Sequence, residues 1–100
     1  MESMESEFER LSRQWKRDTE MLSSVDTVAR HPAYQRIIAM GDPVVPLILS
    51  DLKQHPGTNW FWALTAITGQ NPITEKIAGH MHEMADAWLR LGDEKGWLKN

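Results

Sequence analysis

Apolar residues recur along this chain at helical spacing, and they do not alternate as they would in strands. The pattern is clearest in residues 41–69, where two helices are expected on either side of the breaker His55-Pro56-Gly57. The first has a broad apolar face made by Val45, Leu47, Ile48, Leu49 and Leu52. The second has an apolar stripe at i, i+3, i+4 and i+7, made by Trp60, Ala63, Leu64 and Ile67. No segment requires a strand, so the pattern predicts an all-α fold.

The second of these helices carries no charged residue between Trp60 and Gly69. A helix that is apolar on nearly every side must be covered on more than one side, so we expect it to be the central helix. Asp42 is the predicted N-cap of the preceding helix, and Thr58 or Asn59 is the predicted N-cap of the central one. Gly69 is expected to end the central helix in the left-handed conformation.

Amphipathic helices are also expected toward both ends of the chain. The apolar stripe of the N-terminal helix, within residues 1–22, is Met4, Phe8, Leu11, Trp15 and Leu22. A short helical turn at residues 25–29 and a helix from Pro32 to Gly41 should follow. The stripe of the last helix is Met81, Met84, Ala85, Trp88 and either Leu89 or Leu91, and Gly92 and Gly96 are expected to stop it in two stages.

Together these segments predict one domain over residues 1–100, built as a small bundle of about five helices with a core over residues 32–96. The N-terminal helix is expected to dock on this core or to face a partner. The predicted core residues are Leu47, Ile48, Leu52, Trp60, Leu64, Ile67, Met84 and Trp88.

Residues 32–69 resemble the repeat unit of HEAT-like helical solenoids. The resemblance rests on the run Met40-Gly41-Asp42-Pro43-Val44-Val45-Pro46-Leu47-Ile48, on Asp51-Leu52, and on a partner helix that ends at Gly69. It implies antiparallel helix pairs, and it covers about one and a half repeats. Trp60-Phe61-Trp62 stands where such repeats have a Val-Arg pair, which favours a closed bundle. Residues 31–69 also look like a family of short, uncharacterised bacterial proteins, which implies an independent domain but no activity.

Composition limits the environment in which the chain is expected to act. Apolar residues make up 41% and charged residues 25% of the sequence, which is ordinary for a globular protein. Without cysteine, disulfides and thiolate chemistry are excluded. No apolar run approaches the roughly 20 residues that span a bilayer, and the acidic start is unlike a secretory signal. We therefore expect a cytoplasmic protein that does not bind membranes.

The candidate catalytic groups do not converge in the sequence. His80 and His82 are two positions apart, so on a helix they would point about 200° away from each other, unlike a pair of metal ligands. His82 and Asp86 have i,i+4 spacing, but an exposed pair of this kind is usually solvated. There is no serine in a tight glycine elbow and no glycine-rich phosphate loop. We expect neither an enzyme nor a metal, cofactor or small-molecule ligand.

A basic group on the N-terminal helix supports an alternative function. Its members are Arg10, Arg13, Lys16 and Arg17, and they could contact phosphates as part of a nucleic-acid-associated regulator. The other interpretation is a solvated face balanced by neighbouring glutamates. The net charge of −3 argues against nucleic acid, and the segment from Asn59 to Gly69 offers only Asn59 to read base edges.

The remaining hypothesis is a protein–protein interaction module. Five tryptophans are many for a core of this size, and Phe61 and Trp62 cannot both face the same way as Trp60. The alternative is that the terminal helices cover every side. Trp97 either folds back over the bundle or forms an exposed anchor. The candidate partner-binding residues are Phe8, Trp15, Phe61, Trp62 and Trp97. The expected partner is another protein or a second copy, and the roles open to the chain are an assembly subunit or an antitoxin-like inhibitor.

Overall fold

The computed structural model describes residues 3–21 and 25–98, and it confirms the all-α prediction. The helices are α1 (Met4–Thr19), α2 (Val25–Arg30), α3 (Pro32–Ala39), α4 (Val45–Gln54), α5 (Phe61–Thr68) and α6 (Met81–Lys95), with a 3-10 helix η1 (Asp42–Val44) before α4. No strand occurs within the described ranges. Leu22, which was predicted in the stripe of the first helix, lies outside them.

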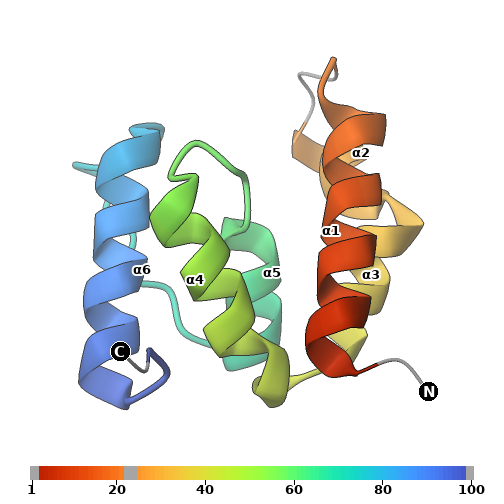
Figure 1. Ribbon diagram of the computed structural model, residues 1–100. Helices are drawn as coiled ribbons and strands as arrows, with labels where there is room; N and C mark the ends of the chain where they lie inside the picture. The colour runs from red at the N-terminus through yellow and green to blue at the C-terminus, as the bar shows by residue number, and fades with distance from the viewer. Residues whose placement is uncertain (1–2, 22–24, 99–100) are drawn as a thin grey trace.

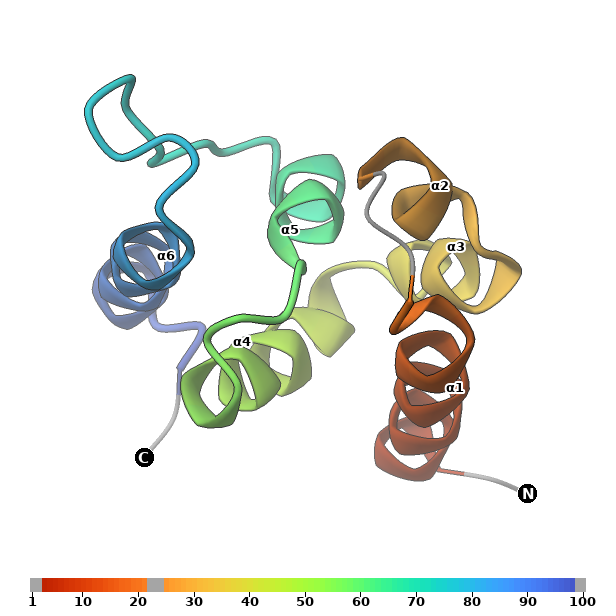
Figure 2. The same ribbon diagram turned by 90° about the horizontal axis from the view of Figure 1, so that it is seen from above.

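The helices form two groups that α5 helps to join. Helices α1, α2 and α3 pack together on one side, and α4 packs against α5 and α6 on the other (Figures 1 and 2). Helix α3 packs against α5 across the middle of the molecule. Because α5 packs against both α3 and α4, the prediction that the helix before Gly69 is covered on more than one side is confirmed. Its outer face is an exception, because Trp62, Thr65 and Ala66 are exposed.

The predicted side-chain caps of the two central helices were wrong. Asp42 is the first residue of η1, and α4 begins after Val44 without a side-chain cap. Trp60 occupies the N-cap position of α5 and no side chain caps this helix, so neither Thr58 nor Asn59 is its N-cap. Gly69 ends α5 with a φ of 72°, as predicted.

Gly96 ends α6 in the left-handed conformation, as predicted, but Gly92, the other predicted stop, lies inside the helix. Gly92 instead allows close packing between α6 and α4. A Cβ atom at Gly92 would lie 2.6 Å from Cδ1 of Leu49, so the absence of a side chain lets α6 approach α4 closely. The chain then folds back, because the N–H of Trp97 donates to the carbonyl oxygen of Gly92 at 2.8 Å.

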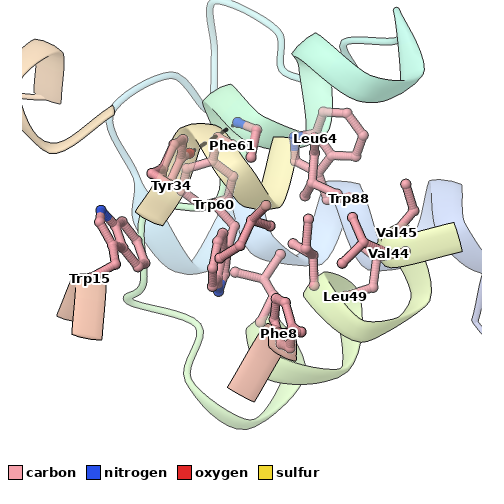
Figure 3. Packing of buried hydrophobic residues seen from close by; sticks show 14 of the residues in the cluster. Phe8, Trp15, Tyr34, Val44, Val45, Leu49, Trp60, Phe61, Leu64 and Trp88 are labelled. Atoms are coloured by element: carbon pink, nitrogen blue, oxygen red, sulfur yellow. Dashed lines mark hydrogen bonds between the residues drawn. The ribbon is translucent and has the colours of Figure 1, made fainter. Parts of the chain in front are cut away.

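The core follows the predicted helical stripes with some shifts. Ile48, Leu52, Trp60, Leu64 and Trp88 were predicted to be buried, and all have 0% exposure. The other predicted members, Leu47, Ile67 and Met84, are only partly buried against this core. Helices α1 and α3 contribute more than was predicted, through the buried residues Phe8, Leu11, Trp15, Ala33, Tyr34 and Ile37. Figure 3 shows three of them, Phe8, Trp15 and Tyr34.

Candidate functional site

Aromatic rings from three parts of the chain meet around Trp60. The Trp60 ring centroid lies 4.6 Å from that of Trp15, 5.6 Å from Phe8 and 5.7 Å from Tyr34 (Figure 3). Aromatic pairs at these separations attract each other in addition to the area that they bury. We call Phe8, Trp15, Tyr34 and Trp60 the aromatic cluster. The cluster packs α1 and α3 against Trp60, the residue that precedes α5.

The aromatic cluster contains two of the residues predicted to bind a partner. Phe8 is 5% exposed and Trp15 is 2% exposed. Trp15 also donates its Nε1–H to the carbonyl oxygen of Val28 at 3.0 Å, so its polar edge is satisfied inside the chain. The apolar stripe of α1 is therefore docked on its own bundle, and in this conformation neither ring is accessible to a partner.

Polar groups at the edge of the cluster are satisfied across helices. Asp51 on α4 accepts a hydrogen bond from Trp60 Nε1 at 2.7 Å and forms an ion pair with Lys16 Nζ at 2.8 Å. The Tyr34 hydroxyl donates to the carbonyl oxygen of Asn59 and accepts from the N–H of Ala63, each at 3.0 Å. Burial raises the pKa of the Tyr34 hydroxyl, and the hydrogen bond from Ala63 partly opposes this effect.

The opposite face of α5 borders an apolar groove of about 580 Å³. Trp62, which is 58% exposed, stands on this groove between α5, the segment after it and the start of α6. We call it the Trp62 groove. Its lining residues are Asn59, Phe61, Trp62, Thr65, Ala66, Asn71, Ile73, Gly79, Met81 and Met84. None of these lining residues carries a charge.

The structure decides which residue of the Phe61-Trp62 pair faces outward. Phe61 is 8% exposed and borders the groove from the core side, whereas most of the Trp62 side chain is accessible. Trp97 is partly buried and packs against the core, as the folded-back alternative predicted. The alternative in which terminal helices cover every side was wrong, because none of the described helices covers Trp62.

The predicted basic group on α1 is mixed with acidic residues. Lys16 pairs with Asp51, and the Nε of Arg17 lies 3.8 Å from Oδ1 of Asp18. Arg13 lines a polar cleft of about 340 Å³ between α1 and α4, together with Glu5 and Glu9. Arg10 is exposed and also has an interaction partner. This arrangement is closer to a balanced solvated face than to a continuous cationic surface.

The histidines do not form a ligand set. His80 and His82 are both exposed at the start of α6. Within residues 3–21 and 25–98, no group of three or more His, Cys, Asp or Glu side chains is placed to hold a metal ion. The helices in these ranges are also too short or too polar to cross a membrane.

Two features of the site were missed by reasoning from the sequence. Met81 and Met84, assigned to the core stripe of the last helix, do pack against the core, but they also line the Trp62 groove. Asp51 was named only as part of the HEAT-like run, and nothing in the sequence indicated that its carboxylate accepts the indole N–H of Trp60. Comparison with known proteins adds nothing further, since no family model, curated protein or solved structure matches the chain.

Proposed function

We propose that this protein is a protein–protein interaction module and that the Trp62 groove is its binding surface. The observation that carries the proposal is a tryptophan with 58% exposure beside an uncharged apolar groove. Tryptophan is strongly enriched at binding hot spots, and exposed apolar surface of this kind is a typical mark of an interface.

The lining of the groove indicates the chemistry of the partner. A charged group buried against Ile73, Met81 and Met84 would lose its hydration without gaining a counter-charge. The partner should therefore present large apolar side chains, such as those along one face of an amphipathic helix. The two methionines are flexible and can adjust to the shape of the inserted side chains.

The role of such a module is to hold another protein, either as a subunit of an assembly in the cytoplasm or as an inhibitor that covers the active surface of its partner. Both roles use the same contact. The resemblance of residues 32–69 to HEAT-like repeats supports a binding role, because helical repeats of that class commonly bind other proteins. The proposed partner is a different protein, and self-association is a separate outcome of the test below.

The test compares two exposed apolar residues. Trp62→Gln changes the groove, and Met21→Gln changes a residue that is 90% exposed and is not part of the groove lining. A partner captured with the wild-type chain is purified, and its affinity is measured by calorimetry for the three proteins. Trp62→Gln should weaken binding at least about 30-fold, whereas Met21→Gln should leave it unchanged.

Two results would contradict the proposal. Equal affinity of the wild type and Trp62→Gln would remove the groove from the interface. A concentration-dependent dimer that Trp62→Gln converts to a monomer would show that the groove binds a second copy instead. Salt dependence gives a further check, because an uncharged contact should lose little affinity as the salt concentration rises.

A further inference from the structure

The imidazole of His31 lies between the end of α1 and the start of α3, and both of its ring nitrogens have a partner. Nδ1 accepts a hydrogen bond from the backbone N–H of Ala33 at 3.0 Å, which makes His31 the N-cap of α3. Nε2 lies 2.9 Å from Oδ2 of Asp18. The side chain is 15% exposed. One ring therefore caps one helix and links it to another.

These two contacts require one form of the ring. A backbone N–H can only donate, so Nδ1 must keep its lone pair to accept from Ala33. A carboxylate can only accept, so Nε2 must carry the hydrogen that points at Asp18. The structure thus requires the neutral imidazole with its hydrogen on Nε2. A protonated ring has hydrogens on both nitrogens, so it can keep the Asp18 contact but not the cap.

We propose that His31 is a proton-sensitive N-cap, which releases the first turn of α3 when Nδ1 is protonated. The Ala33 N–H is one of the first-turn donors that have no acceptor within a helix, and Pro32 before it has no N–H. Its hydrogen bond to Nδ1 is lost on protonation. Histidine is the side chain best suited to such a device, because imidazole changes charge near physiological pH.

The charges around the ring determine what protonation does. On α1, Asp18 attracts a positive ring, and Arg17, whose Nε lies 3.8 Å from Asp18, offsets part of that attraction. Arg30, the last residue of α2, precedes His31 in the chain and has an interaction partner of its own. Helix α3 has no acidic residue in its first turn, and a positive charge at a helix N-terminus is unfavourable. Protonation therefore keeps the link to α1 while it weakens the start of α3.

The effect should be local to the first turn of α3. Nη2 of Arg36, in the last turn of α3, lies 3.4 Å from Oε2 of Glu7 on α1. This ion pair does not depend on the cap at the other end of the helix. The hydrogen bond from the N–H of Met40 to the carbonyl oxygen of Ile37 is at the far end of the helix. Ala33 itself is buried, so its release loosens the edge where α3 meets its neighbours. This inference does not rest on the Trp62 groove.

Nuclear magnetic resonance of the full chain tests the device directly. Nitrogen chemical shifts at neutral pH should place the hydrogen of His31 on Nε2, and a hydrogen on Nδ1 would overturn the inference. Amide exchange, corrected for the intrinsic rate at each pH, should show about a fivefold loss of Ala33 protection on acidification from about pH 8 to about pH 5. The Met40 amide serves as the internal control and should not change.

The matched variant is His31→Asn. Asparagine is among the best N-cap residues, and its Oδ1 accepts from Ala33 without titrating, so Ala33 protection should no longer depend on pH. A second variant, Asp18→Asn, keeps an acceptor for Nε2 and leaves the Nδ1 cap in place, so the pH response of Ala33 should remain. The inference fails if Ala33 responds to pH equally in the wild type and His31→Asn, or if Asp18→Asn abolishes the response.

Discussion

Trp60 and Trp62 are two positions apart at the start of α5, but their surroundings are opposite. Trp60 has 0% exposure, contacts three other aromatic rings and donates its Nε1–H to Asp51. Trp62 is 58% exposed and stands on an uncharged groove. Positions two apart on a helix differ by about 200°, so the two rings face different sides of the molecule. The side chain is the same, and the neighbouring elements decide its role.

The neighbours of the two faces differ in kind. Whole helices cover the Trp60 face, since α1 supplies Phe8 and Trp15 and α3 supplies Tyr34. The Trp62 face is bordered by the segment that follows α5 and by the first residues of α6. Stability should therefore depend on the first face and binding on the second. Substitutions on each face can test this division.

Trp60→Ala should have the largest effect on stability. It removes the ring at the centre of the aromatic cluster and leaves a cavity that three helices cannot easily fill, so the free energy of unfolding should fall by about 3–5 kcal/mol. Urea denaturation followed by circular dichroism measures this change. A loss below about 1 kcal/mol would mean that the cluster does not hold the two groups of helices together.

The contrast between the two faces could be predicted from the sequence only in part. The i, i+3, i+4, i+7 spacing that starts at Trp60 correctly placed Trp60, Ala63 and Leu64 in the core. Spacing alone could not decide between Phe61 and Trp62, because both lie outside that stripe. The answer depends on which elements cover each side, and this is set by the path of residues 71–79 beside α5.

Local sequence features also failed to predict the structure where packing between helices overrides them. Because glycine is common at helix ends, Gly92 was predicted as the first of two stops of α6, but its missing side chain instead makes room for Leu49 of α4. The partner of Trp60 was missed for a similar reason. Asp51 is nine positions earlier in the sequence, and only the packing of α4 beside α5 brings its carboxylate to the indole nitrogen.

Asp51→Ala should have the second largest effect. The substitution leaves the Nε1–H of the fully buried Trp60 without its acceptor and also removes the ion pair to Lys16. Because hydrogen bonds to charged groups contribute about 1.5–3 kcal/mol, the free energy of unfolding should fall by a similar amount. Lys16→Met, which breaks only a partly exposed ion pair, should cost less than about 1 kcal/mol. Equal costs for the two variants would show that the indole contact contributes nothing.

Ionisation of Tyr34, in the aromatic cluster, should make the free energy of unfolding depend on pH in the alkaline range. Its raised pKa means that above about pH 10, the ordinary value for tyrosine, the unfolded chain loses the phenolic proton while the folded chain keeps it. The unfolded state is then favoured, so the free energy of unfolding should decrease as pH rises above that value. Tyr34 is the single tyrosine, so its ionisation can be followed by tyrosinate absorbance.

Tyr34→Phe isolates this contribution. At neutral pH the variant should be less stable by about 1 kcal/mol, because the carbonyl of Asn59 and the N–H of Ala63 lose their partner. Its stability should then fall less steeply than that of the wild type above pH 10 or so, since the remaining alkaline titration comes from other groups. Parallel pH profiles for the two proteins would mean that the hydroxyl ionises as freely in the folded chain as in the unfolded one.

Trp62→Ala should have the smallest effect on stability. Most of the ring is already in water, so its removal should change the free energy of unfolding by no more than about 0.5 kcal/mol. Measured in the same denaturation experiment, Trp62→Ala and Trp60→Ala make the same substitution in two different surroundings. If Trp62→Ala costs as much as Trp60→Ala, the ring on the groove is part of the core and the division between a stabilising face and a binding face is wrong. If it costs little, yet the variant no longer binds the protein that the wild type holds, the exposed tryptophan is present for its partner and not for the fold.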